Sequence, residues 1–146
     1  GKKLLVCSGK LQDKRFPEYT SDIKLFIHQN GLEAFIKILG FIDRSEQLCL
    51  MSNSYAIIQP SLFEGWSTVV EDAKAMNKFI YLSNLPVHIE QSPVNACYFD
   101  PHNQDDLTEK LLKIVPTTIN FDYCYNQKMF ALKFLEIINT FGKNIL

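Results

Sequence analysis

The sequence predicts an α/β fold in which a parallel sheet has helices on both faces. Short apolar runs alternate along the chain with stretches that repeat apolar residues at helical spacing. This alternation is typical of strand–helix–strand units, which build parallel sheets. The apolar runs are nearly continuous, as expected for strands that are buried on both faces. A length of 146 residues fits one domain of ordinary size.

The apolar runs give the expected strands. Five are predicted, over Lys3–Gly9, Ala34–Leu39, Tyr55–Pro60, Lys78–Ser83 and Ala96–Asp100. The first of them, "KLLVCSG", is expected to be a buried strand. Gly40 closes the second strand and Pro60 ends the third, because proline cannot donate a hydrogen bond to a neighbouring strand.

Helices are predicted between and after these strands. They cover Ser21–Asn30, Arg44 to about Ser52, Ser67 to about Met76, Asn103–Val115 and Asp122 to about Phe141. Ser21 or Asp22 is the expected cap of the first helix, Asp43 caps the second, and Ser67 or Thr68 caps the third. Asn30 and Gly31 end the first helix. The stretch 84–93 has two prolines and is interpreted as a loop, in which His88 and Glu90 are solvated.

Composition limits the classes of function. The net charge of −1 gives no electrostatic signature for nucleic acid. No apolar run approaches the roughly 18 residues that span a membrane, and no signal peptide is visible. The four cysteines are widely spaced, so we expect reduced and mostly buried thiols in a cytoplasmic protein. Three isolated histidines give no zinc pattern.

The segment "PSLFEGWSTVVEDAKAMNK", residues 60–78, carries the candidate site. Ligands of parallel sheets bind at the carboxyl ends of strands, where this segment begins. Glu64 stands in the loop, and Gly65 allows the backbone to turn or a ligand to approach closely. The amides from Trp66 to Val69 open a helix, which favours a phosphate group. Asp72 lies further along the helix and can reach back to bind a vicinal diol.

A purely structural interpretation of the same acids is also open. Carboxylates in a first helical turn stabilise the helix dipole without any ligand. Glu71 and Lys74 are three residues apart and can form a surface ion pair. Lys10, Lys14 and Arg15 form a small basic cluster near a strand end, which fits either phosphate binding or a solvated loop.

Residues 57–91, "IIQPSLFEGWSTVVEDAKAMNKFIYLSNLPVHIEQ", resemble the donor-binding segment of GT-B type retaining glycosyltransferases of family four. The shared pattern is a strand, a Pro-Ser loop, a first acid, seven residues and a second acid, followed by a strand and a loop with Pro, His and Glu. Residues 38–51, "ILGFIDRSEQLCLM", are similar to the family's preceding segment. The resemblance covers roughly residues 34–115 and implies a Rossmann-like domain, one half of a GT-B fold.

The resemblance implies roles for individual residues. Glu64 matches the first acid, which contacts the donor sugar near the reacting centre and is the candidate catalytic residue. Asp72 matches the second acid, which binds the ribose hydroxyls, although this position is usually Glu, and the neighbouring Glu71 is a possible substitute. The other donor-binding residues that the resemblance implies are Gly65, Trp66, Ser67 and Thr68 at the diphosphate and Gly40, Phe41 and Ile42 beside the base.

The family has two Rossmann-like domains, and a chain of this length accommodates one. The family's basic pair for the diphosphate would precede "KKLLVCSG". We therefore expect residues 1–146 to be an N-terminally truncated nucleotide-sugar domain, inactive alone. Its terminal helix, within 118–146, is expected to pack toward the missing domain, which would bind a glycan, lipid or other acceptor. The resemblance implies no cofactor and no metal, and a cytoplasmic enzyme with peripheral association at the inner membrane face as a further expectation.

Two other classes remain open. A nucleotide-sugar 2-epimerase has the same architecture, but its additional acid–base residues have no assignable counterparts here. A non-catalytic, flavodoxin-like binding module is the second alternative. A receiver domain, as one such module, would need acids at the end of its first strand, and "LLVCSGK" has none.

Overall fold

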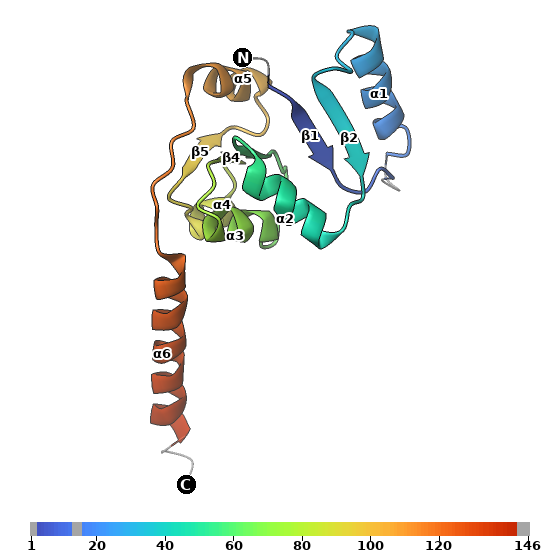
Figure 1. Ribbon diagram of the computed structural model, residues 1–146. Helices are drawn as coiled ribbons and strands as arrows, with labels where there is room; N and C mark the ends of the chain where they lie inside the picture. Colours follow the sequence, from blue (N-terminus) through green and yellow to red (C-terminus); the bar gives the residue numbers. More distant parts are fainter. Residues whose placement is uncertain (1–2, 13–15, 143–146) are drawn as a thin grey trace. The chain divides into compact units, whose positions relative to one another are not determined.

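The computed structural model describes residues 3–12 and 16–142, without the side chains of residues 126, 141 and 142 (Figure 1). The chain forms two compact units, Gly1–Leu50 and Met51–Leu146. Each unit holds a parallel sheet with helices around it, so the predicted α/β class is confirmed. The strands pair as one two-stranded and one three-stranded sheet.

The first unit contains β1 (Leu5–Ser8), α1 (Tyr19–Gln29) and β2 (Ile36–Gly40). β1 and β2 are parallel, with Leu5 opposite Ile36. The first strand forms as predicted, but the prediction that it is buried is wrong, because all four residues of β1 are exposed. β1 has one hydrogen-bonded neighbour in its sheet, whereas the prediction assumed a strand inside a larger sheet.

The helix caps of this half of the chain were predicted with mixed success. α1 begins before Ser21 and Asp22, with Glu18 at the cap position, so both predicted caps are wrong. Asp22 lies instead in the first turn, where its charge favours the helix dipole. Asp43 does cap α2 (Arg44–Asn53): its Oδ1 accepts from the Glu46 amide at 2.9 Å, and its own amide donates to Glu46 Oε2 at 3.1 Å. This reciprocal pair is a capping box.

The second unit is built on β3 (Ile57–Gln59), β4 (Ile80–Ser83) and β5 (Ala96–Phe99) in the order β3-β4-β5. All pairs are parallel, and Ile80 stands opposite both Ile57 and Ala96. The connecting helices are α3 (Thr68–Ala75), α4 (Pro86–Gln91) and α5 (Gln104–Lys113). α4 corrects the predicted loop, since Pro86 occupies the first helical turn, where a missing N–H costs nothing.

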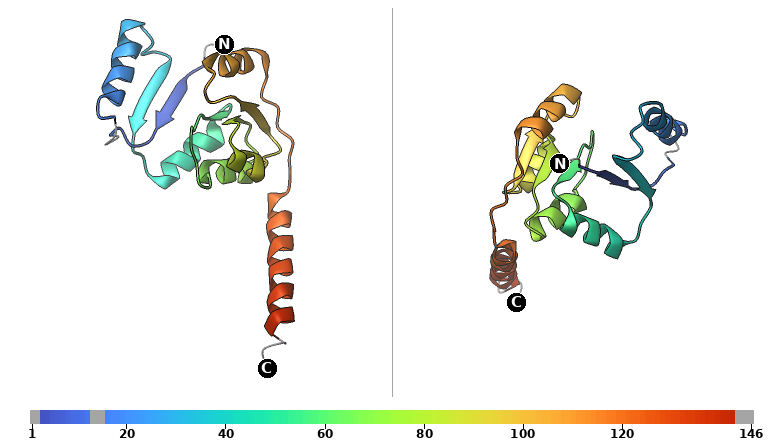
Figure 2. Two further views of the ribbon diagram at one scale, coloured as in Figure 1. Left: turned by 180° about the vertical axis from the view of Figure 1, so that it is seen from behind. Right: turned by 45° about the horizontal axis from the view of Figure 1, so that its top comes forward.

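Helices cover both faces of this sheet, and the core alternates along β4. Val70 and Ala73 of α3 pack against Ile80 and Leu82 on one face. Phe79 and Tyr81 lie on the other face, where Leu107 of α5 packs against them. Every residue of β4 is buried, as a central strand requires. Figure 2 shows the same sheet from behind and, in its right-hand view, with the top turned toward the viewer.

Two asparagine side chains hold an extended segment beside this sheet. Asn95 Oδ1 accepts from the Ile119 amide at 2.7 Å, and Asn95 Nδ2 donates to the Ile119 carbonyl at 2.9 Å. Asn77 makes the same pair of bonds with Phe121, at 2.9 and 3.2 Å. Asn77 and Asn95 precede β4 and β5 at the amino edge of the sheet, so they fix the path of the chain into the last helix.

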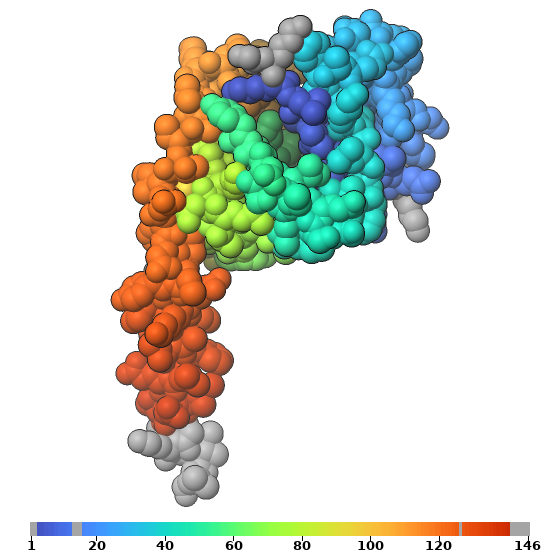
Figure 3. All heavy atoms as spheres, viewed as in Figure 1, coloured from blue at the N-terminus to red at the C-terminus, as the bar shows by residue number. Residues whose placement is uncertain are grey.

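That last helix is α6 (Tyr123–Gly142). Its large apolar side chains are exposed, among them Phe130, Phe134 and Ile137. The space-filling view shows α6 in orange and red with no other segment over its visible face (Figure 3). Within the described residues, no helix is long and apolar enough to cross a membrane.

The cysteines differ from the expectation of mostly buried thiols. Cys97 in β5 is buried, but Cys7, Cys49 and Cys124 are exposed. Cys7 lies on the exposed β1, so the error in its burial follows from the error in that strand. Burial raises the pKa of the Cys97 thiol.

Candidate functional site

The loop between β3 and α3 lies at the carboxyl edge of the three-stranded sheet, where ligands of parallel sheets bind. It runs from Pro60 to Ser67. Leu62, Phe63 and Trp66 expose most of their side-chain surface here. Large apolar side chains gathered on one exposed loop are typical of a surface that meets a ligand or partner.

Glu64 is half-buried and held in place by two neighbours. Gln59 Nε2 and Ser61 Oγ both donate to Glu64 Oε1 at 2.9 Å, and Gln59 Nε2 also reaches Ser61 Oγ at 3.0 Å. Gln59 is the last residue of β3, so the strand end itself orients the carboxylate. Glu64 Oε2 takes neither of these bonds and is the oxygen that can face a ligand.

The start of α3 has the features of an anion site. Ser67 is the cap residue but makes no side-chain cap bond, and its Oγ is buried with no hydrogen-bond partner among the described residues. By helix geometry the amides of Thr68, Val69 and Val70 have no acceptor within the helix. Three free amides and a buried hydroxyl at the positive end of a helix dipole favour a negatively charged group.

Gly65 leaves open space beside this start. A side chain at this position would meet no atom within 4 Å. Its φ is not in the left-handed region, so the turn itself does not require glycine. Neither the turn nor a neighbouring atom therefore requires glycine here, and close approach of a ligand to Gly65 stays a prediction.

A polar cluster lies against the first turn of α3. Gln91 is 3% exposed, donates from Nε2 to the Ser67 carbonyl and to Glu71 Oε1, both at 2.9 Å, and accepts from the Ser67 amide at 3.3 Å. Lys74 Nζ contacts Glu71 Oε1 at 3.2 Å. The predicted Glu71–Lys74 pair exists, but the lysine side chain is only 16% exposed, so it is not a surface pair.

Asp72 lies one turn beyond Thr68 on the same face of α3. Its side chain is half-buried, with one carboxylate oxygen fully buried. Glu71, one residue earlier, points to the Gln91 side of the helix. The two acids therefore face different surroundings: Glu71 belongs to the polar cluster, and Asp72 remains the acid on the Thr68 face.

His88 corrects the sequence interpretation. It was expected in a solvated loop, but it is fully buried in α4, whereas Glu90 is exposed as expected. His88 Nδ1 lies 2.8 Å from the Ser83 carbonyl and 3.2 Å from Ser83 Oγ. A ring nitrogen beside a carbonyl must donate, so His88 Nδ1 carries a proton. Tyr98 Oη donates to the His88 carbonyl at 3.3 Å, and burial raises the pKa of Tyr98, which keeps it a donor.

The residues predicted beside the base lie in the first unit. Gly40 ends β2 with a φ of +76°, which favours glycine, and a side chain there would also press on Leu11 at 3.3 Å. Phe41 is exposed and Ile42 is half-buried. Lys10 of the predicted basic cluster is exposed, while Lys14 and Arg15 lie outside the described residues.

Sequence reasoning missed the residues that support the site. Gln59 and Ser61 orient Glu64, and Gln91 anchors Ser67. A signal for Gln91 was present: it stands three residues after His88, so both occupy one face of any helix that follows Pro86. The prolines at both ends of that stretch led to a loop prediction instead.

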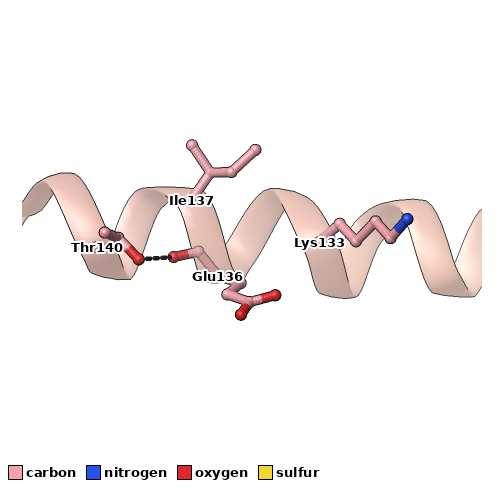
Figure 4. A pocket seen from close by; sticks show the side chains of 4 residues that line it. All are labelled: Lys133, Glu136, Ile137 and Thr140. Carbon is pink, nitrogen blue, oxygen red and sulfur yellow. Dashed lines mark hydrogen bonds between the residues drawn. The ribbon is translucent and has the colours of Figure 1, made fainter.

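A shallow hollow on α6 is separate from this loop. It is lined by Lys133, Glu136, Ile137 and Thr140, all from one helix (Figure 4). Thr140 Oγ1 donates to the Glu136 carbonyl at 2.8 Å within the helix. Among the described residues, no group of three His, Cys, Asp or Glu side chains is placed to bind a metal ion.

Comparison with known proteins supports a glycosyltransferase-like relationship. The chain is similar to a sucrose synthase of Melioribacter roseus, with 25% identity over 124 residues. The match covers 77% of this chain and 16% of the relative, so the chain spans about a sixth of that protein's length. No family model and no solved structure matches the chain.

Proposed function

We propose that this chain is the donor-binding domain of a retaining glycosyltransferase, one that binds a nucleoside-diphosphate sugar. The observation that carries the proposal is the start of α3. There the buried Ser67 hydroxyl has no hydrogen-bond partner among the described residues, and the amides of Thr68 to Val70 have no acceptor within the helix. Glu64, three residues before Ser67, is already oriented by Gln59 and Ser61. Similarity to a protein named sucrose synthase and the order of the residues in the Pro60–Lys78 segment support the same function.

The chemistry of the proposed reaction assigns work to each group. The bond between the anomeric carbon and the diphosphate breaks, and the diphosphate leaves with the electron pair. The α3 amides stabilise this growing negative charge, because they are fixed before the reaction begins. Glu64 Oε2 orients the donor sugar, and Asp72 accepts hydrogen bonds from the ribose hydroxyls. An acceptor hydroxyl then attacks the anomeric carbon on the face that the diphosphate leaves, and its proton passes to an oxygen of the departing diphosphate. The acceptor is a glycan, lipid or other molecule and would be bound by a second domain of the full-length protein.

The single tryptophan provides the test. Trp66 is the only tryptophan in the sequence, is 54% exposed and stands between Gly65 and Ser67. Its fluorescence should therefore report a ligand at the start of α3. The chain is titrated with UDP, GDP and ADP and, in parallel, with uridine, guanosine and adenosine.

One diphosphate is expected to change Trp66 fluorescence at a lower concentration than its own nucleoside and to raise the melting temperature in proportion to occupancy. Equal binding of a diphosphate and its nucleoside would contradict the role of the α3 amides. Absence of binding by all three diphosphates at millimolar concentration, in this chain and in one extended at its N-terminus, would contradict the proposed function.

A further inference from the structure

Gln91 connects two helices through contacts that the reaction itself does not explain. It is the last residue of α4, and its side-chain amide bonds both backbone groups of Ser67, the cap residue of α3. The two residues are 24 positions apart in sequence. A side chain that pairs with both N–H and C=O of one residue fixes that peptide in orientation as well as in position.

Gln91 bonds one of the backbone amides at the start of α3 and leaves the next three to other acceptors. Four amides at a helix start have no partner within the helix, here those of Ser67, Thr68, Val69 and Val70. Gln91 Oε1 accepts from the first of these. The Ser67 carbonyl in turn accepts from both Gln91 Nε2 and the Glu71 amide, which closes the first turn. The remaining three amides have no acceptor within the helix, and the same bonds hold the turn that carries them.

Gln91 also controls the nearest negative charge. Its second amide proton goes to Glu71 Oε1, which Lys74 contacts as well. Lys74 further donates to the Gln91 carbonyl at 3.0 Å and lies 5.5 Å from the centre of the Tyr123 ring. The Glu71 carboxylate is therefore held by two donors, Gln91 Nε2 and Lys74 Nζ, and the lysine offsets its charge.

The helix that carries Gln91 is itself anchored to the sheet. His88, one turn earlier on the same face, bonds Ser83 at the carboxyl end of β4. α4 is thus fixed to β4 by His88 and to α3 by Gln91. We infer that Gln91 is a positioning residue for diphosphate binding: it sets the orientation of the first-turn amides of α3 and holds the Glu71 carboxylate in one place. This inference rests on the proposed donor site.

A nucleoside and its diphosphate separate this role from general stability. The nucleoside lacks the groups that the α3 amides bind, so loss of Gln91 should leave nucleoside affinity unchanged. We expect Gln91→Leu to weaken binding of the preferred diphosphate about tenfold, because several amide contacts to the diphosphate are misaligned together. The ratio of diphosphate to nucleoside affinity is the measured quantity.

Asn95→Leu is the matched control. Asn95 is also a buried amide that bonds both backbone groups of one residue, but it lies at the amino edge of the sheet. The Asn95→Leu variant should lower the melting temperature as Gln91→Leu does. It should leave the ratio of diphosphate to nucleoside affinity unchanged. Should Gln91→Leu fail to fold, Gln91→Glu replaces it: this residue has the same shape, but its carboxylate cannot donate to Glu71 and repels both Glu71 and the diphosphate.

The outcomes are distinguishable. A wild-type preference for the diphosphate that falls in the Gln91 variant and persists in Asn95→Leu supports the inference. A wild-type preference that persists in the Gln91 variant overturns the inference and leaves the proposed function standing. Absence of any diphosphate preference in the wild-type chain contradicts the proposed site, and the inference is overturned with it.

Discussion

The side-chain amide of Asn95 bonds both backbone groups of Ile119, accepting at 2.7 Å and donating at 2.9 Å. Asn77 repeats the arrangement with Phe121, two residues further on. The extended segment is thus held as an added strand would be, but by side chains. The contacts lie at the amino edge of the sheet and leave the carboxyl edge, with its candidate site, open.

Asn95→Leu should lower the free energy of unfolding by about 2 kcal/mol, because two hydrogen bonds are lost from a buried amide. Urea denaturation followed by circular dichroism measures the change. The exposed Asn84, converted to leucine, is the control. Equal loss in the two variants would show that the contacts with Ile119 do not stabilise the fold.

Glu64→Gln should reduce turnover of the full-length protein by about 100-fold or more, because the fixed charge beside the donor sugar is removed. The melting temperature should change little, since an amide oxygen can still accept from Gln59 and Ser61. The exposed Glu90, converted to glutamine, provides a control for the loss of one charge. Normal turnover in Glu64→Gln would refute its assigned role.

Asp72→Asn should weaken binding of the preferred nucleoside diphosphate about tenfold, because hydrogen bonds to a charged acceptor are worth roughly 1.5–3 kcal/mol. The ribose assignment makes a sharper prediction with the 2′,3′-dideoxy analogue. This analogue should bind the wild-type chain more weakly, and Asp72→Asn should weaken it no further. An equal additional loss for the analogue and the parent diphosphate would place Asp72 away from the ribose.

Acid should weaken the attachment of α5. Asp106 accepts from Lys110 Nζ and from the Asp100 amide, and these bonds, the lysine first, lower the pKa of its carboxyl group in the folded chain. A lowered folded-state pKa adds stability that is fully present above the unfolded value of about 4 and is lost as pH falls through the folded value.

The stability difference between wild type and Asp106→Asn should therefore be largest near pH 7 and shrink below about pH 4. Urea denaturation of both proteins across this range is the measurement. If the difference in unfolding free energy between the two proteins stayed constant with pH, the substitution would act through packing and not through the charge of Asp106.

The sequence predicts the parallel pairing and the position of Glu64 well, because apolar runs and turn residues are local signals. Gly40 and Asp43 were placed correctly for the same reason. The prediction of burial failed at β1, since a strand's exposure depends on how many neighbouring strands pair with it. The loop prediction for the stretch that holds His88 and Gln91 failed because it has a proline near each end. The helix that forms there is stabilised by contacts with Ser83 and with Ser67, and Ser67 is 24 residues away from Gln91.

The central claim is that a diphosphate binds at the start of α3. Nuclear magnetic resonance of the ¹⁵N-labelled chain measures it most directly, through the amide signals of Thr68, Val69 and Val70. We predict that the preferred nucleoside diphosphate shifts these three signals strongly and that its nucleoside does not. Diphosphate binding that shifts signals elsewhere and leaves these three unchanged would contradict the account.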